Sequence, residues 1–302
     1  MARSLLESHV TSPYGVILLN QAVLTPEQVA FYREHEYLIL RQVVPEALLQ
    51  GAQAAIERWV DALIEHWRSE GKLTDPFRGA PFHKRLMLAW NAAGKPPYNP
   101  NPTLEIVGRE MYDILRYPLF IQIAQQLFES PNVTASGIFH CRPNLPEQAF
   151  TDTPWHQDGQ CCPSLAGTKF MVMWTPLMDV DEHNACLQAA IGRQHQGKLY
   201  PRYKDPAGYY IAMRPRDVKQ LHSIETLRMQ RGDLLFFNEM LPHRAIPNHS
   251  DAIRWSIDMR YYESANSSVV SASRSFICAD ADPARVEDSY EEWLRRMHTP
   301  IN

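Results

Sequence analysis

Residues 254–261 read Arg-Trp-Ser-Ile-Asp-Met-Arg-Tyr, in which polar and apolar side chains alternate. Successive side chains of a β-strand point to opposite faces, so this stretch predicts a strand with one apolar and one polar face. The polar face would carry Arg254, Ser256, Asp258 and Arg260. Polar groups that share one face in this way need a reason to point into the protein together.

Other extended segments precede this strand and are separated by turn residues. They cover residues 133–141, 153–158, 170–177 and 234–237. Short strands between such turns predict an antiparallel β-sheet assembly. Amphipathic helical patterns come earlier in the chain, within residues 45–67, 104–115 and 119–128. Helices followed by strands predict an α+β protein.

No flexible linker divides the chain, so we predict one domain over residues 1–302. Its helical part would cover about 25–130, its strand core about 131–265, and a last helix about 283–297. The helices are expected to cover the outside of a barrel or sandwich made by the strands.

Three local patterns add to this outline. Thr25 is the expected N-cap of the first helix, because Pro26 and Gln28 stand at its first and third positions. Residues 71–103 are rich in Pro, Gly and Asn and are expected to form a long loop. Residues 198–228 mix aromatic and basic side chains, which would suit either a substrate lid or a solvated connection.

Composition narrows the class of protein. The chain has 302 residues, of which 45% are hydrophobic and 21% charged, as expected for a globular protein. A net charge of -4 gives no electrostatic case for a nucleic-acid partner, and no apolar run reaches the length of a membrane span. Five cysteines without a Cys-x-x-Cys pair, and a start without an apolar signal, predict free thiols and a cytoplasmic location. No pattern indicates an oligomeric state.

His156 and Asp158 lie two residues apart in the stretch Trp-His-Gln-Asp-Gly at 155–159. On a strand both side chains would point to the same side. An imidazole and a carboxylate make up two thirds of the 2-His-1-carboxylate triad that holds non-heme Fe(II). By itself such a pair is more often a surface loop or a hydrogen-bonded pair, so a second histidine is needed.

The second histidine is expected on a later strand that lies next to the first in space. The histidines that follow are His183, His195, His222, His243 and His249. Only His243 closely follows an apolar strand, at residues 234–237. We therefore predict that His156, Asp158 and His243 form a metal site.

Arg254 and Ser256 suggest why the polar face of the last strand points inward. A guanidinium binds a carboxylate through two hydrogen bonds, and the hydroxyl two residues on lies beside it. This pair suits a dicarboxylate such as 2-oxoglutarate, whose other end chelates iron. Arg254 alone would more often be a partner in an ion pair, so the hypothesis depends on the combination with the metal site.

These residues carry a family resemblance. The chain resembles the phytanoyl-CoA dioxygenase family of Fe(II)/2-oxoglutarate oxygenases over roughly residues 28–265. The matching pieces are Trp-His-Gln-Asp-Gly at 155–159, Met-Trp-Thr-Pro-Leu at 173–177, Arg-Gly-Asp-Leu-Leu-Phe-Phe at 231–237, and the stretch from His243 to Tyr261. The resemblance implies a double-stranded β-helix (jelly-roll) core flanked by helices.

The resemblance also implies cofactors and roles for residues. Iron would be held by His156, Asp158 and His243, and Arg254 would hold the distal carboxylate of 2-oxoglutarate. Trp174 falls at a family position close to this cosubstrate, and Lys84 or Arg85 matches a basic residue that often assists. Dioxygen is the other cosubstrate, and ascorbate would support turnover.

Two positions refine this expectation. Some members place a hydroxyl residue two after the distal histidine, where this chain has Ala245, so Ser256 is the expected hydroxyl partner. Asp158 is present, which disfavours the related halogenases that lack this carboxylate.

The expected reaction is hydroxylation of an aliphatic C–H bond, with release of succinate and CO2. The substrate would be a small organic molecule, such as a natural-product intermediate or a lipid-like acid. Desaturation and cyclisation use the same chemistry and stay open. A zinc-binding protein or a non-catalytic jelly roll is the alternative from another class.

Overall fold

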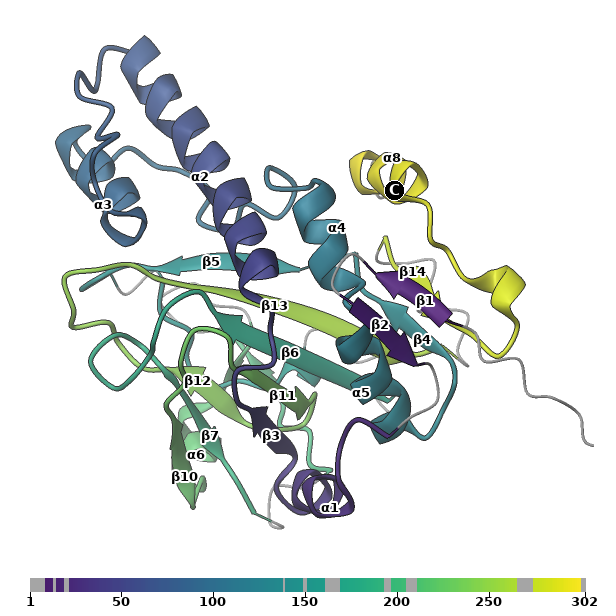
Figure 1. Ribbon diagram of the computed structural model, residues 1–302. Coiled ribbons are helices and arrows are strands. Elements are labelled where there is room, and N and C mark those ends of the chain that lie inside the picture. The colour runs from purple at the N-terminus through teal and green to yellow at the C-terminus, as the bar shows by residue number, and fades with distance from the viewer. Residues whose placement is uncertain are drawn as a thin grey trace, which may run out of the picture.

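The computed structural model describes residues 9–12, 15–18, 22–137, 139–148, 151–160, 169–192, 197–204, 211–264 and 274–299. Its helices lie mainly on one side of a large sheet, and a smaller sheet lies on the other side (Figure 1). The helices are α1 Pro26–His35, α2 Glu46–Ser69, α3 Phe82–Ala92, α4 Arg109–Leu115, α5 Pro118–Phe128, α6 Pro215–Val218 and α8 Tyr290–His298, with 3-10 turns η2 Asp158–Gln160 and η4 Pro283–Arg285.

Two antiparallel sheets form the core. The large sheet has the order β14-β4-β13-β6-β11-β3, and β5 also pairs with β13. Its strands are β3 Tyr37–Leu40, β4 Val133–Ala135, β5 His140–Asn144, β6 Phe170–Pro176, β11 Leu234–Asn238, β13 Arg254–Glu263 and β14 Phe276–Ala279. The small sheet has the order β10-β7-β12, made by β7 Leu187–Ala190, β10 Ile224–Leu227 and β12 His243–Ala245. Two-stranded ribbons add β1 His9–Ser12 with β2 Gly15–Leu18, and β8 Arg202–Tyr203 with β9 Ala212–Met213.

The central strand β6 is buried on both faces because it separates two hydrophobic cores. Met171 and Met173 point to the core that the helices share with the large sheet. Val172 and Trp174 point to a second core between the two sheets. This alternation follows from the two-residue period of a strand, and it gives the two-sheet arrangement of a double-stranded β-helix.

Strand β13 has the two faces that its sequence predicts. Its apolar side chains point toward the helices, where the ring of Trp255 stacks on Phe82 of α3 and meets Trp59 of α2 edge-on. Its polar side chains point to the inside, between the sheets. The helices therefore hold β13 from outside and leave its inner face to build a site.

Several expectations are confirmed. The chain is α+β, the Thr25 capping box is formed, and α2 buries its predicted apolar stripe. The described residues include no helix that is both long and apolar enough to cross a bilayer.

Other expectations need correction. Residues 71–103 are not one loop, because α3 lies within them. The strand core extends beyond 131–265, since β3 and β14 both belong to the large sheet. The region expected as one C-terminal helix, 283–297, is a 3-10 turn followed by α8.

Candidate metal centre

His156 and His243 lie side by side at the edge of the small sheet. Each donates its backbone N–H to the carbonyl of the other, with both N···O distances at 3.0 Å. This β-bridge places the two rings with centroids 4.1 Å apart. Two histidines far apart in sequence are therefore brought together by sheet pairing.

Asp158 reaches the same space from a turn. The predicted strand over 153–158 is wrong, because only His156 makes a bridge and Asp158 begins the 3-10 turn η2. The turn is tied down by the N–H of Gly159, which donates to the carbonyl of Glu239 at 2.9 Å. A Cβ on Gly159 would lie 3.2 Å from that oxygen, so the close approach favours glycine here.

The side chain of Gln157, between the two ligand candidates, is used for a different purpose. It is fully buried, donates to the carbonyls of Lys198 and Met240, and accepts from the N–H of Tyr200. Gln157 thereby fastens this segment to two neighbouring loops, while His156 and Asp158 face the site.

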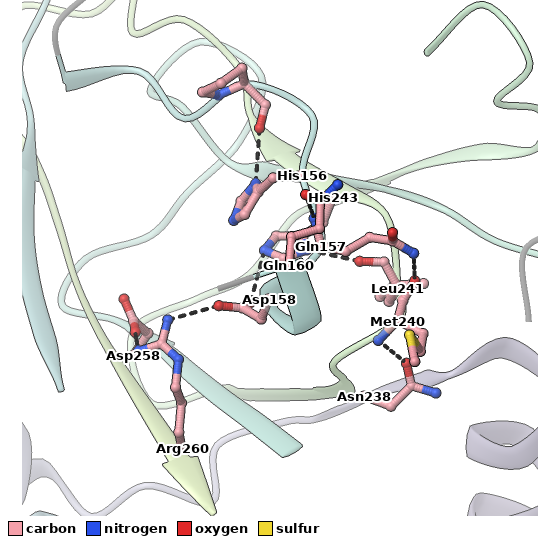
Figure 2. A network of polar contacts seen from close by, with 11 residues as sticks. His156, Gln157, Asp158, Gln160, Asn238, Met240, Leu241, His243, Asp258 and Arg260 are labelled. Carbon is pink, nitrogen blue, oxygen red and sulfur yellow. Dashed lines mark hydrogen bonds and ion pairs between the residues drawn. The ribbon is translucent and has the colours of Figure 1, made fainter. Parts of the chain in front are cut away.

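The three side chains converge, as Figure 2 shows. One ligand atom from each of His156, Asp158 and His243 lies within 4.8 Å of the other two, and all three residues are buried. Nε2 of His243 is 3.5 Å from Oδ2 of Asp158. The hypothesis that these three residues share one site is therefore supported by their geometry.

The protonation of the triad suits a divalent cation. Nδ1 of His156 lies 2.9 Å from the carbonyl of Pro154, and Nδ1 of His243 lies 3.0 Å from that of Leu241. A carbonyl only accepts, so each Nδ1 carries the proton and each Nε2 keeps a lone pair. Burial lowers the pKa of both histidines, that of His156 to about 3, which keeps both rings neutral.

Asp158 is held in its charged form. Burial is the largest single influence and would raise its pKa, but the charge and hydrogen bond of Arg260 and the two neighbouring histidines together lower the pKa below the ordinary value. Two neutral imidazoles and one carboxylate form the donor set of a 2-His-1-carboxylate Fe(II) site, so the residues present fit this metal.

Arg254 lies on the inner face of β13 and is buried. It donates to the hydroxyl of Ser256 at 2.6 Å and to the carbonyl of Ala185 at 3.1 Å. Its guanidinium carbon lies 5.6 Å from the ring centroid of Trp174, and burial lowers its pKa to about 10. Among the described residues no carboxylate forms an ion pair with Arg254. A buried cation of this kind suits an anionic ligand.

Arg260 contacts Asp158 directly. Its Nη2 donates to Oδ1 of Asp158 and its Nη1 donates to Oδ1 of Asp258, each at 2.8 Å. Figure 2 shows Arg260 between the two carboxylates. The sequence placed Arg260 and Asp258 on the inner face of the strand but gave neither a role.

Lys84 and Arg85 lie in the first turn of α3, and each has an acidic partner. Lys84 pairs with the exposed Asp251 at 2.5 Å, and Arg85 pairs with Asp61 of α2 at 2.5 Å. The described contacts of these two residues therefore do not include the triad or Arg254.

Strand β5 supplies polar groups that the sequence analysis missed. Antiparallel pairing places Arg142 opposite Ser256 and His140 opposite Asp258, on the face that lines the site. A side-chain atom of Asn101 lies 2.8 Å from Nδ1 of His140. The available signal was the alternation of polar residues with Cys141 and Pro143 within residues 140–144.

Part of the segment 198–228 forms a wall of the site. Ala212 of β9 bridges to His156, and the N–H of Met213 donates to the carbonyl of Trp155 at 2.7 Å. Tyr200 and Leu221 pack with Trp155 in a small core. Tyr209 and Tyr210, which the lid hypothesis included, lie outside the described residues, as does His195.

Several solved structures share this fold. The carbocyclase SnoK of nogalamycin biosynthesis, described as alpha-ketoglutarate dependent, is 19% identical with a TM-score of 0.51, covering 80% of this chain and 85% of that one. EctD from S. alaskensis, solved with 2-oxoglutarate and 5-hydroxyectoine, is 14% identical with a TM-score of 0.57, covering 82% and 79%. These likenesses confirm the jelly-roll fold.

Sequence comparison gives the family. The family model described as Phytanoyl-CoA dioxygenase (PhyH) matches residues 32–256, more than half of the chain. The chain belongs to this family. The peroxisomal phytanoyl-CoA dioxygenase of Mus musculus is 25% identical over 256 residues, which cover 80% of this chain and 70% of the relative. Family and fold together support an enzyme of the Fe(II)/2-oxoglutarate-dependent dioxygenase type.

Proposed function

We propose that the protein is an Fe(II)/2-oxoglutarate dioxygenase that hydroxylates an aliphatic C–H bond of a small organic substrate. The observation that carries this proposal is the buried convergence of His156, Asp158 and His243 within 4.8 Å. In the balanced reaction, substrate, dioxygen and 2-oxoglutarate give hydroxylated substrate, succinate and CO2.

His156, Asp158 and His243 would hold the iron. When bound, iron supplies the activation of dioxygen and the oxidative decarboxylation of 2-oxoglutarate. The carbonyls of Pro154 and Leu241 keep both imidazoles in the tautomer that leaves Nε2 available for the metal. All three side chains are buried, so the protein would limit the access of water and protect a reactive site from side reactions.

Arg254 would hold the distal carboxylate of 2-oxoglutarate. Its contact with Ser256 places a hydroxyl beside the guanidinium, and the ring of Trp174 lies next to it. Lys84 or Arg85 would make an additional contact with 2-oxoglutarate. The segment that carries them lies close to Arg254, since the N–H of Ile253 donates to the carbonyl of His83 at 2.7 Å.

The substrate would be a natural-product intermediate or a lipid-like acid. The net charge of -4 supports a small molecule rather than a nucleic acid.

Succinate release tests the proposal. Metal-free protein is incubated with Fe(II), ascorbate and 2-oxoglutarate, with and without candidate acids, and His156→Ala serves as the control. The expected result is iron-dependent succinate that rises with substrate and is lost in the variant. A protein that releases none under any of these conditions would be a zinc-binding or non-catalytic member of the fold.

The same incubation distinguishes the possible reactions. Hydroxylation adds one oxygen atom to the substrate, whereas desaturation or cyclisation removes two hydrogen atoms. Mass spectrometry of the product after incubation under labelled dioxygen separates these outcomes.

We also propose that the protein acts in the cytoplasm. The described cysteines Cys141, Cys186 and Cys278 are buried free thiols, which suits a reducing compartment. The murine relative is named as peroxisomal, so cell fractionation with cytosolic and peroxisomal markers decides between the two compartments.

A further inference from the structure

We propose that Arg260 is a positioning residue that orients the carboxylate of Asp158 so that only Oδ2 is presented to the metal. The inference rests on the proposed function, since it takes Asp158 to be a metal ligand. Oδ1 of Asp158 accepts from Nη2 of Arg260 at 2.8 Å, while Oδ2 lies 3.5 Å from Nε2 of His243. One oxygen of the Asp158 carboxylate therefore binds Arg260, while the other faces His243.

Asp158 needs such a partner because of where it lies in the chain. The pleat of a paired strand would fix the direction of its side chain, but Asp158 begins a three-residue 3-10 turn. The last torsion of an aspartate side chain is soft, so a free carboxylate would rotate between one-oxygen and two-oxygen ligation. The hydrogen bond from Arg260 removes this freedom.

Arg260 is itself rigidly placed. It lies on the ten-residue strand β13, where it pairs with Val172 of β6. Its carbonyl accepts from the N–H of Ser136 on the other side, at 2.8 Å. Its side chain is only 13% exposed and is held at Nη1 by Asp258, two residues away on the same face. Because β13 is hydrogen-bonded on both sides, Arg260 has a fixed place from which it holds the carboxylate of Asp158 on the turn.

Asp258 also balances the charge. A lone cation 2.8 Å from Asp158 would withdraw electron density from that carboxylate and weaken it as a ligand. The carboxylate of Asp258 lies equally close to the same guanidinium and offsets its charge. We expect the pair to orient Asp158 without reducing its affinity for a divalent cation.

Co(II) titration of metal-free protein tests the proposal. The variants are Arg260→Gln, which removes the charge and the fork, Arg260→Lys, which keeps the charge, and Asp258→Asn. Arg228→Gln is the matched control, because Arg228 makes a two-point ion pair with Glu182 on the surface. The thermal midpoint of each metal-free protein shows whether it is folded.

For Arg260→Gln we expect Co(II) to bind about 10- to 100-fold more weakly than in the unmodified protein, as for other partners of metal ligands. The visible spectrum of bound Co(II) should also change, because the carboxylate can then offer both oxygens. Arg260→Lys should restore part of the affinity and Arg228→Gln should change neither property. If the salt bridge served stability alone, its loss in Arg260→Gln would lower the thermal midpoint and leave the Co(II) affinity and spectrum unchanged.

Unchanged Co(II) affinity and spectrum in folded Arg260→Gln would overturn the proposal. If that variant does not fold, unchanged affinity and spectrum in both Arg260→Lys and Asp258→Asn would overturn it equally. Failure of the proposed function looks different: Co(II) binding would depend on His156 and Arg260, but no 2-oxoglutarate-dependent succinate would form. Co(II) binding that is equally tight in His156→Ala would overturn both the proposed function and the role of Arg260.

Discussion

His156 and His243 exchange a pair of backbone hydrogen bonds, so the same β-bridge that closes the edge of the small sheet also sets the spacing of two imidazoles. Their ring centroids are 4.1 Å apart, and each Nδ1 donates to a carbonyl two residues earlier in the chain. Backbone pairing therefore sets the spacing of the two imidazoles that we propose as metal ligands.

Metal binding should stabilise the folded protein. A ligand that binds only the folded state adds about 2.7 kcal/mol to the free energy of unfolding at about 100 times its Kd. We expect this gain with Mn(II) or Fe(II), and none in His243→Ala. Urea denaturation with and without metal measures it, and an equal gain in both proteins would place the metal elsewhere.

Arg254→Met should bind 2-oxoglutarate more weakly and still bind the metal. Removing one partner of a buried charge pair costs about 2–5 kcal/mol, which raises the Kd for 2-oxoglutarate by at least about 30-fold. Calorimetric titration of the Mn(II)-loaded variant measures the loss. Arg228→Gln removes an exposed arginine and should bind the cosubstrate normally. Unimpaired binding in Arg254→Met would transfer the role to another cation such as Lys84.

The metal-free protein should become less stable as the pH falls below 6.5. The pKa of His156 is lowered to about 3 in the folded state, so the unfolded chain takes up a proton first. The contribution of neutral His156 to stability is fully present above the pKa that this residue has in the unfolded chain. It is lost as the pH falls toward the pKa of His156 in the folded protein. In His156→Gln the decline should be shallower, by on the order of 1 kcal/mol per pH unit. Urea denaturation at decreasing pH measures both slopes, and equal slopes would contradict a neutral, buried His156.

Trp255→Ala should cost about 3–5 kcal/mol of unfolding free energy, because it leaves a cavity between β13 and the helices. Trp255 is fully buried and contacts Phe82 and Trp59. Phe31→Ala, at an exposed position, should change stability little. Chemical denaturation compares the two, and a small loss at Trp255 would mean that the helices do not anchor the strand.

Local sequence patterns predicted the features that depend on neighbouring residues, such as the two faces of a strand and the apolar stripe of a helix. The alternation within 254–261 predicted both faces of β13, and the spacing of apolar residues predicted α2. The same logic predicted that His243 lies near His156 and Asp158, because His243 follows an apolar strand. Helix α3 was missed since its Pro- and Gly-rich flanks dominate residues 71–103.

Apart from the approach of His243 to His156 and Asp158, contacts between distant segments could not be predicted from these patterns. The pairing of Arg260 with Asp158 joins residues 102 apart, and the order of strands in a sheet is not written in any one strand. The small sheet was largely missed because its strands have only three or four residues. Asp158 was expected on a strand, and its place on a turn follows from the tether between Gly159 and Glu239.

The most direct test of the central claim is the visible absorption of the protein with Fe(II) and 2-oxoglutarate in the absence of dioxygen. Chelation of triad-bound iron by the 2-oxo acid should produce a charge-transfer band that needs both components. We expect this band in the unmodified protein and its loss in His156→Ala. No band in the unmodified protein, or an equal band in the variant, would contradict an iron and 2-oxoglutarate site at His156, Asp158 and His243.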